Sequence, residues 1–344
     1  MSEHRASHPS ELFGADFLTE TISPLKRGAW RLRSWRLTRV IERPPTRILF
    51  YQIRYESGGG QRVRTARLVA KLYGDHRGPR AIAGLRRLRQ AGFRAPAPDR
   101  VPRPYGYSAG RRALLQARAP GVMWADVLRD DPARLAAASA QAADWLIQLQ
   151  RCPVDSHAGS HTEDLAVVER CAAELGSGFP GYAARLRSPT QRLLSRLGGE
   201  AMDQVVAHGD YHPENVFLAA GGKTTVIDFD GLGRREPAFD VGYAIGQLLA
   251  MSYVGHRDHA PGARAATAFW QRYQLCGSAP WPRVALHAAR SVLLALHFEL
   301  CALGNQRADL LEPWTALIEA WLRSEGTQTL EALVGDRSGT GVPI

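Results

Sequence analysis

The sequence predicts an α+β protein with two lobes, a small β-rich lobe followed by a larger, mainly helical lobe. Two observations carry this prediction. Segments that read as strands, separated by Pro and Gly turns, occupy the first third of the chain, and segments that read as helices fill most of the remainder. At 344 residues the chain is long enough for two modest domains or for one bilobal unit.

The first lobe is expected to end at a chain break formed by Ala119-Pro120-Gly121. Turns at Pro44-Pro45 and Gly58-Gly59-Gly60 separate its first three strands. The elements predicted before the break are strands at 37–41, 48–55 and 64–73, a helix at 80–90 and a strand at 113–116. A Pro-rich stretch lies between that helix and the last strand.

The second lobe is predicted to be helical with one strand-rich island. Its predicted helices are 131–150, 163–175, 182–197, 240–251, 263–275, 284–303 and 311–323, and the island is 205–229. The predicted organisation is an N-terminal extension (1–34), an N-lobe (35–120), a C-lobe (121–335) and a loose tail (336–344).

The composition is that of a soluble globular protein, with 45% hydrophobic and 22% charged residues. No apolar run approaches the roughly 18–20 residues that span a bilayer, and the polar N-terminus lacks the apolar stretch of a signal peptide. The four cysteines are scattered and lack metal-ligand spacing, as expected of free thiols in a reducing compartment. We therefore expect a cytoplasmic protein with no membrane partner.

The net charge of +11 is unevenly distributed. Residues 1–120 hold 25 Lys and Arg against 8 Asp and Glu, a balance of +17, and the remaining residues hold 19 against 25, a balance of −6. This asymmetry suits an enzyme that takes a polyanion on one side and a neutral or cationic partner on the other. A solvated Arg-rich surface is the alternative, because 41 of the 44 basic residues are Arg. No nucleic-acid motif accompanies the charge, so nucleic-acid binding is not expected.

The segment 206–241 carries the chemistry. It contains His208-Gly209-Asp210, then Asn215 five residues after Asp210, and a hairpin over 216–227 that ends at Asp228. Phosphoryl transfer needs a carboxylate that orients the attacking hydroxyl and oxygen ligands for Mg²⁺ on the phosphates. Asp210 is the predicted base, and Asn215 and Asp228 are the predicted Mg²⁺ ligands. The alternative makes these residues ordinary turn and strand-end positions.

These motifs resemble the catalytic loop and metal-binding Asp of protein kinases. They are more similar to the aminoglycoside phosphotransferase and choline kinase superfamily, whose loop begins His-Gly-Asp, and the stretch 231–242 also looks like that family's continuation. The resemblance covers roughly residues 35–325. It implies a protein-kinase-like fold, ATP as the phosphate donor, Mg²⁺ as the metal and a hydroxyl of a small molecule as the acceptor.

The nucleotide side of the prediction rests on Lys71. Strand alternation places Val69 and Lys71 on one face, where Val69 would cover adenine and Lys71 would bind the α- and β-phosphates, as the strand Lys does in kinases. The segment from Gln116 through Arg118 to residue 121 is the predicted interlobe hinge, whose backbone would read adenine. A solvated surface Lys is the alternative.

Several neighbouring residues receive secondary roles. His208 is predicted to belong to the catalytic site, although its ring is expected to hold the loop more than to move protons. His212 is either a phosphate contact or exposed, and Asp240 is an N-cap, a brace for the loop, or both. Glu299 and His297 are candidate acceptor contacts, with surface positions as the alternative.

The chain departs from the kinase pattern at two places. The turn after the first strand, Arg43 to Arg47, lacks the Gly-rich loop, and the helix 80–90 contains no acid that could pair with Lys71. Lys71 is therefore expected to contact Asp228 or a backbone carbonyl. A catalytically silent, nucleotide-binding pseudokinase is the rival interpretation, and the oligomeric state is left open.

Overall fold

The computed structural model describes residues 13–43, 46–57, 62–154, 161–199, 203–305, 307–323 and 330–332. The chain divides into two compact units, one formed by residues up to Pro120 together with Thr225–Asp230, and the other by Gly121–Thr224 with Gly231 onward. The turns at 44–45 and 58–60 and the tail at 336–344 that the sequence predicts lie outside the described residues.

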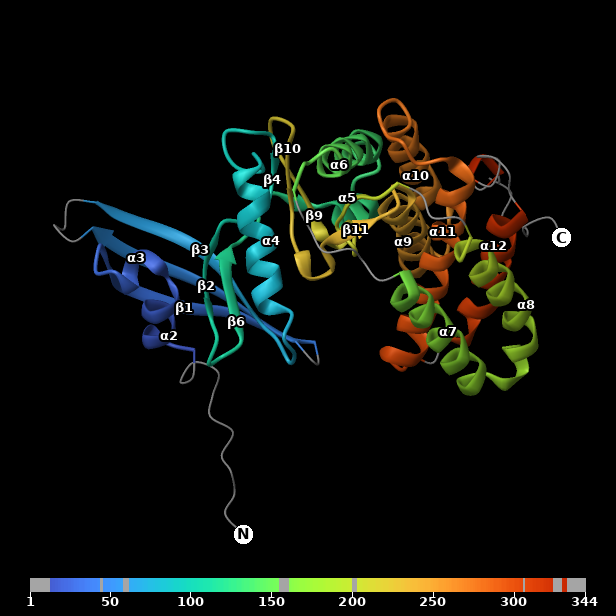
Figure 1. The fold of residues 1–344 in the computed structure, drawn as a ribbon, viewed down its shortest axis with the longest axis horizontal. Helices are drawn as coiled ribbons and strands as arrows, with labels where there is room; N and C mark the ends of the chain where they lie inside the picture. The colour runs from blue at the N-terminus through green and yellow to red at the C-terminus, as the bar shows by residue number, and fades with distance from the viewer. Residues whose placement is uncertain are drawn as a thin grey trace, which may run out of the picture. The chain divides into compact units, whose positions relative to one another are not determined.

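A five-stranded antiparallel sheet in the order β1-β2-β3-β6-β5 organises the first unit (Figure 1). Helix α4 packs against β5 and β6. The bounds are β1 Trp30–Arg43, β2 Thr46–Ser57, β3 Val63–Leu72, α4 Gly78–Gln90, β4 Asp99–Arg100, β5 Pro104–Ser108 and β6 Ala113–Ala117. β5 was missed because it begins in the Pro-rich stretch, and a Pro is tolerated at the start of a strand on a sheet edge.

The segment before β1 belongs to the core of the first unit. It forms two short helices, α2 (Ala15–Thr21) and α3 (Ser23–Lys26). Phe17 and Leu18 are fully buried in one cluster with Leu68 of β3, and the Tyr51 hydroxyl donates a hydrogen bond of 3.0 Å to the Phe13 carbonyl. Helices this short leave too few periodic residues for the sequence to reveal them.

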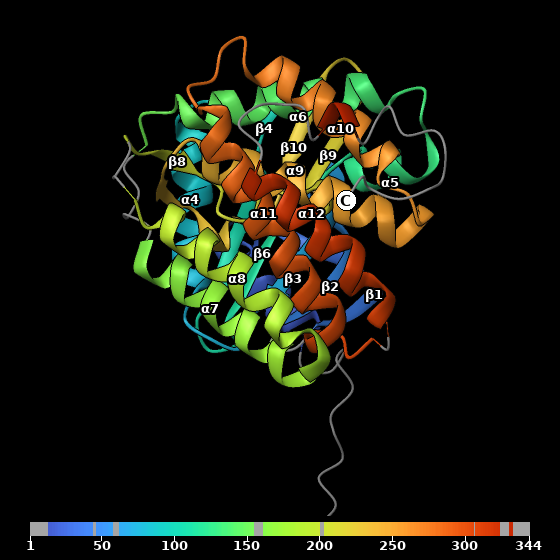
Figure 2. The ribbon, with the colours of Figure 1, turned by 90° about the vertical axis from the view of Figure 1, so that its right-hand side faces the viewer.

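The second unit is built from eight α-helices within the described residues. Their bounds are α5 Trp124–Asp130, α6 Leu135–Gln150, α7 His161–Gly178, α8 Pro180–Leu197, α9 Ala238–His256, α10 Ala260–Tyr273, α11 Trp281–His297 and α12 Leu311–Arg323. The predicted helix 131–150 starts four residues later because Pro132 disfavours helical geometry at Asp131. Helices α7 and α8 lie side by side, and α12 packs on α8 and α11 (Figure 2).

Helices α9 and α11 approach each other closely through glycines. A Cβ atom at Gly242 would lie 2.4 Å from the Val284 carbonyl oxygen, and one at Gly246 would lie 2.5 Å from the Ser291 Cβ. The stretch Trp281–Ala302, α11 with the π-helical turn η3 (Phe298–Ala302), is long and apolar enough to cross a membrane, contrary to the expectation that no such run exists. Of its apolar window, 72% is buried inside the protein, as in a core helix.

Short strands frame the predicted catalytic loop. In the second unit β8 (Val205–Ala207) pairs with β11 (Gly233–Arg235), and β7 (Val122–Met123) pairs with β9 (Val216–Ala219). The loop from His208 runs between β8 and the 3₁₀ turn η1 (Pro213–Asn215). After β9, β10 (Lys223–Val226) carries the chain back to the first unit, and η2 (Phe229–Gly231) returns it to the second.

Candidate functional site

The loop that follows β8 is anchored by one buried carboxylate. Asp240, in the first turn of α9 and 1% exposed, accepts backbone N–H hydrogen bonds from His208 (2.6 Å) and Gly209 (3.0 Å). The bracing role expected of Asp240 is therefore confirmed. The N-cap alternative is wrong, because the helix begins two residues earlier, at Ala238, and Pro237 occupies the cap.

Gly209 explains why the loop begins His-Gly-Asp. Its φ of +86° lies in the left-handed region, and an added Cβ would lie 2.2 Å from the carbonyl oxygen of Gly231. A larger residue would push apart two backbone segments of the second unit, the loop and the start of the stretch 231–242. The spacing of the two motifs therefore reflects direct backbone packing.

His208 holds the loop from inside. Its ring is fully buried and lies edge-on to Trp145 and Tyr211, whose own rings stack on each other. Its Nδ1 accepts a hydrogen bond of 3.2 Å from the backbone N–H of Asp210. These contacts fit a positioning residue, the role that the sequence favoured for His208.

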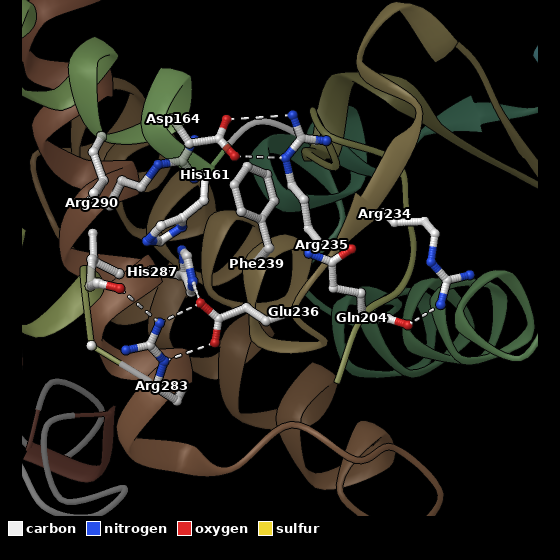
Figure 3. Close-up of a pocket in the computed structure, with 13 residues that line it drawn as sticks. His161, Asp164, Gln204, Arg234, Arg235, Glu236, Phe239, Arg283, His287 and Arg290 are labelled. Carbon is white, nitrogen blue, oxygen red and sulfur yellow. Dashed lines mark hydrogen bonds and ion pairs between the residues drawn. The ribbon is translucent and has the colours of Figure 1, made fainter. Parts of the chain in front are cut away.

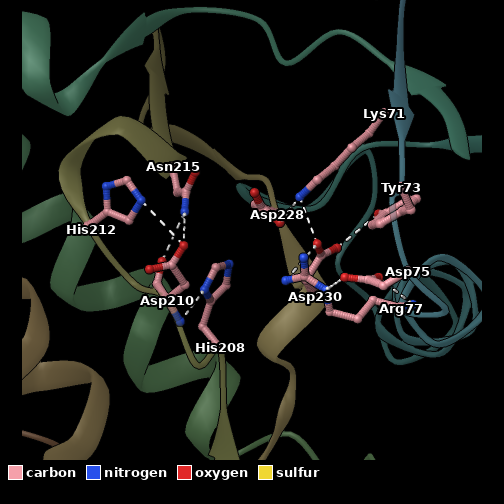
Figure 4. Close-up of polar contacts among 10 residues, drawn as sticks. All are labelled: Lys71, Tyr73, Asp75, Arg77, His208, Asp210, His212, Asn215, Asp228 and Asp230. Carbon is pink, nitrogen blue, oxygen red and sulfur yellow. Dashed lines mark hydrogen bonds and ion pairs between the residues drawn. The ribbon is translucent and has the colours of Figure 1, made fainter. Parts of the chain in front are cut away.

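Asp210 stands in a set of polar contacts, with 43% of its side chain exposed (Figure 4). The Asn215 amide donates to the Asp210 carbonyl (3.0 Å) and to its carboxylate (3.4 Å), and His212 Nε2 lies 3.5 Å from the same carboxylate oxygen. Partial burial opposes ionisation, but His212, His208 and a hydrogen bond from Tyr243 outweigh it and lower the pKa of Asp210. The carboxylate is therefore ionised at neutral pH.

Lys71 is held by two carboxylates of the first unit. Its Nζ donates to Asp228 (2.6 Å) and Asp230 (2.8 Å), and only 14% of the side chain is exposed. The Tyr73 hydroxyl donates to the second oxygen of Asp230 (2.9 Å), and Arg77 lies 3.7 Å from that carboxylate. Burial lowers the pKa of Lys71, but the two Asp residues outweigh burial and raise it. The expected contact of Lys71 with Asp228 is confirmed.

The Asp228 carboxylate, 31% exposed, can serve as an oxygen ligand for a divalent cation. Burial and the neighbouring charge of Asp228 raise the pKa of Asp230, despite the contact with Lys71, so two negative charges crowd this position. Asp228 adopts a φ of +67°, an uncommon conformation for a residue other than Gly, and this turns its carboxylate toward Lys71. Within the described ranges no group of three His, Cys, Asp or Glu residues could hold a metal. Mg²⁺ fits such a sparse oxygen set, because it keeps waters and phosphate oxygens as its remaining ligands.

The other nucleotide-side residues share the sheet with Lys71. Val69 is half-buried on the face opposite the buried Leu68 and pairs in register with Gln116 of β6. The Arg118 N–H donates to the Arg67 carbonyl (2.9 Å), and its guanidinium lies 5.7 Å from the centre of the Phe50 ring. Val69, Gln116 and Lys71 are thus brought together, whereas the Arg118 side chain packs on β2.

Comparison with known proteins identifies the family. The sequence matches the family model described as the phosphotransferase enzyme family over residues 51–287. The chain belongs to the phosphotransferase enzyme family. None of the curated proteins matches this phosphotransferase-family chain.

Solved structures show the same fold. A thermostable mutant of aminoglycoside phosphotransferase APH(4)-Ia, in a ternary complex with AMP-PNP and hygromycin B, has a TM-score of 0.57 at 15% identity, over 86% of this chain and 95% of that chain. The macrolide 2'-phosphotransferase MphH from Brachybacterium faecium gives 0.52 at 18% identity, over 88% and 98%. A choline/ethanolamine kinase family protein from Mesorhizobium loti gives 0.53 at 14%, over 82% and 88%. The protein-kinase-like fold expected from the sequence is confirmed.

The sequence did not predict three side chains that contact Lys71 or Asp210. Asp230 and Tyr73 complete the surroundings of Lys71, and Tyr243 hydrogen-bonds Asp210. The absence of an acid from α4 was a signal for Asp230, since the nearest motif carboxylates lie in Asp228-Phe229-Asp230. No sequence signal points to Tyr243, which reaches Asp210 from the second turn of α9.

The two residues suggested as acceptor contacts lie at the end of α11 and in η3. His297 Nε2 is 2.5 Å from Glu174 of α7, and the Glu299 carboxylate accepts a hydrogen bond of 2.8 Å from Asn305. Both therefore make local structural contacts.

Proposed function

We propose that this chain transfers the γ-phosphate of ATP to a hydroxyl group of a small molecule. One observation carries the proposal. In a chain of the phosphotransferase family, an ionised Asp210 is fixed by Asn215, His212 and Tyr243 in a loop that a buried carboxylate anchors. Such an arrangement suits a base that must orient an acceptor before reaction.

On the acceptor side, Asp210 would receive the proton of the attacking hydroxyl. The acceptor O–H bond breaks, a new O–P bond forms to the γ-phosphorus, and the bond from that phosphorus to the bridging oxygen breaks to release ADP. The lowered pKa of Asp210 makes it a weak base, which is enough here because phosphoryl transfer depends mainly on positioning and on stabilising charge. His208 and Asp240 would act by holding the loop.

On the nucleotide side, Lys71 would exchange carboxylate partners for phosphate oxygens. Asp228 would hold Mg²⁺, which when bound neutralises charge on the phosphates, and Asn215 stays the second ligand that the sequence predicts. Asp230, at 10% exposure, would then remain as the partner that aims Lys71. The pseudokinase alternative is not supported, because Asp210, Asn215 and Asp228 are all present and Asp230 supplies a partner that α4 lacks.

The ligands named for similar structures support this donor and acceptor class. AMP-PNP with hygromycin B is named for one APH(4)-Ia mutant complex, and ADP with hygromycin B for another. These bound ligands favour ATP as the donor and a hydroxyl-bearing small molecule as the acceptor for this chain. The four free cysteines are consistent with the cytoplasmic location that we also propose.

Release of ADP tests the proposal. The full chain is incubated with Mg²⁺ and ATP against separate pools of sugars, amino alcohols, hydroxy acids and aminoglycosides, beside Asp210→Asn. We expect one pool to raise ADP release in the wild type, with roughly 10²- to 10⁴-fold less in the variant. Equal rates in both proteins with the accepted pool would overturn the assignment of Asp210. ATP that fails to bind in the presence of Mg²⁺ would overturn the proposed donor.

A further inference from the structure

A pocket of about 150 Å³ in the second unit is rich in cationic side chains (Figure 3). It is formed by the start of α7, by β11 and by one face of α11. Four Arg residues and two acids line it. They are Arg234, Arg235, Arg283, Arg290, Asp164 and Glu236.

Most of these charges neutralise one another. Glu236 accepts hydrogen bonds from Arg283 (2.8 and 2.5 Å) and lies 2.7 Å from the Nε2 of His287, so its charge is already shared. Asp164 accepts two hydrogen bonds from Arg235 (2.9 and 3.4 Å). Both acids of the pocket are therefore committed to other partners.

Arg234 donates to the Gln204 carbonyl, and Arg290 is the buried Arg of the pocket that makes no ion pair among the described residues. It is 6% exposed, and its Nε and Nη1 have no hydrogen-bond partner among the described residues. Its guanidinium carbon lies 4.2 Å from the centre of the Phe239 ring and 5.9 Å from that of Tyr243. Arg235 lies over the same Phe239 ring at 4.6 Å, so a second cation, not an anion, shares this contact.

A buried guanidinium without an anionic partner is unfavourable, and ring contacts compensate it only in part. Its planar donors match a carboxylate, phosphate or sulfate group in two parallel hydrogen bonds. The unpaired donors of Arg290 therefore define a place for an oxyanion.

Tyr243 lies between the wall of the pocket and Asp210, within the same unit. Tyr243 lies next to Arg290 through its ring and hydrogen-bonds the Asp210 carboxylate through its hydroxyl. One side chain thus separates the unpaired guanidinium from the proposed base.

We propose that this pocket binds an oxyanion group of the acceptor, so that the acceptor is an acid-bearing alcohol and Arg290 selects it. This inference rests on the proposed function. The acidic balance of residues 121–344 favours amino-bearing or polyhydroxylated compounds, whereas the local charge of the pocket favours a compound with an anionic group.

The first experiment measures anion binding without turnover. Thermal unfolding of the full chain is titrated with sodium sulfate and with sodium malonate, against sodium chloride at matched ionic strength. We expect a saturable rise in Tm for the wild type and for Arg272→Met, an exposed Arg paired with Asp144 away from the pocket. Arg290→Met should lose at least about tenfold in apparent affinity. Its own Tm should not fall, because the variant removes a buried unpaired charge.

Two outcomes overturn the binding site. One is a rise in the Tm of the wild type that is equal in sulfate, malonate and chloride, which would mean an adventitious ion only. The other is a rise in the Tm of Arg290→Met equal to that of the wild type. If Arg290→Met does not fold, Arg290→Lys takes its place. It keeps the charge but not the two parallel hydrogen bonds, so it should bind sulfate more weakly than the wild type, and equal binding overturns the role of Arg290.

The second experiment measures acceptor choice. ADP release is compared among hydroxy acids, sugar phosphates, amino alcohols and aminoglycosides. We expect turnover with the acid-bearing pools and a KM at least about tenfold higher in Arg290→Met, with kcat changed less. Turnover confined to the cationic pools overturns the acceptor class and leaves the proposed phosphotransfer intact. Failure of every pool while ATP binds overturns the phosphotransfer, and the sulfate titration still decides the pocket.

Discussion

The loop after β8 and the cluster formed by Lys71, Asp228 and Asp230 are each stabilised by a different kind of interaction. The loop is fixed by hydrogen bonds from its own backbone to a buried side chain, Asp240, and by a buried imidazole, His208. The cluster is fixed by ion pairs between side chains, Lys71 with Asp228 and Asp230. A loop of the first kind is complete before any ligand binds, whereas a cluster of the second kind has partners that a ligand can replace.

This difference assigns separate tasks to the two regions. A preformed loop suits the step in which an acceptor hydroxyl must be oriented, because no reorganisation is then needed during reaction. A cluster with exchangeable partners suits the binding and release of a charged nucleotide. Variants of the loop should therefore change turnover, and variants of the cluster should change nucleotide affinity.

The largest effect is expected for Asp210→Asn. Turnover should fall by roughly 10³-fold, because the amide cannot accept the acceptor proton, while ATP affinity stays within a few fold. Isothermal titration with Mg²⁺ and ATP, beside ADP release, measures both quantities on one preparation. A loss of nucleotide affinity as large as the loss of turnover would remove the distinction between the regions.

Asp228→Ala should act on the other region. The substitution leaves Lys71 without one of its two ion-pair partners and removes a proposed Mg²⁺ ligand, so we expect Mg²⁺-dependent ATP binding to weaken by about 2–5 kcal/mol. Calorimetry with and without EDTA measures the change. Asp75→Ala is the matched control, since Asp75 is 41% exposed and pairs only locally with Arg77. Unchanged affinity in Asp228→Ala would contradict the assignment.

The ion-pair group formed by Glu236, Arg283 and His287 should make the stability of the protein depend on pH. Burial opposes ionisation of Glu236, but hydrogen bonds from His287 and Arg283 outweigh it and lower the pKa of Glu236 to about 2. Because the pKa of Glu236 is lower in the folded protein than its unfolded value near 4.5, its ionised form stabilises the fold at pH values above 4.5. This stabilisation is lost as the pH falls toward 2, and it amounts to about 3 kcal/mol at most.

Glu236→Gln should abolish that pH-dependent part. Urea unfolding between pH 6 and pH 3 measures it, and Glu319→Gln, which removes an ordinary helical i,i+4 pair with Arg323, is the control. The same slope of stability against pH in wild type and Glu236→Gln would show that this ion-pair group contributes nothing.

Asp240→Asn tests how the loop is anchored. Asp240 accepts two backbone N–H bonds, and hydrogen bonds to a charged group contribute about 1.5–3 kcal/mol, so the variant should lose roughly that much stability. Turnover should fall while ATP affinity is unchanged. Denaturant unfolding with Asp309→Asn, a half-exposed acid, as control measures the difference. Unchanged stability would mean that the loop is held mainly by His208 and Gly209.

The architecture was largely predictable because most elements are long and periodic. The predicted helix at 311–323 coincides with α12, and the strand at 64–73 is displaced by one residue from β3. The elements that the sequence did not predict are those in which the hydrophobic pattern is short or is contradicted by a Pro. Helix α2 is only seven residues long, and β5 begins at a Pro. Both are stabilised by tertiary contacts that no local pattern records.

The residues of the candidate site also fall into those that the sequence could predict and those that it could not. Asp210, Asn215 and Asp228 follow from motif spacing, because the chemistry fixes which residue types must follow one another. Arg290 and Tyr243 do not, because their importance depends on which side chains from other helices surround them. A lone Arg on a helix is an ordinary surface residue until its burial and lack of a partner are known.

The smallest effect is expected for Lys71→Arg, which keeps the charge and changes its shape. Lys71 presents a compact ammonium that contacts two carboxylates at 2.6 and 2.8 Å in a position only 14% exposed. A planar guanidinium is wider and directs its donors in a fixed fork, so it cannot contact both acids and then two phosphates in the same space. We expect ATP affinity to fall by roughly tenfold, about 1.4 kcal/mol. The chain supplies a matched control in Lys223→Arg, because Lys223 is one of only three Lys residues and lies exposed at the start of β10. Nucleotide titration of both variants gives the comparison. If Lys71→Arg binds ATP as tightly as Lys223→Arg, then the cluster recognises only charge, and its ion pairs serve the fold of the first unit and not the nucleotide.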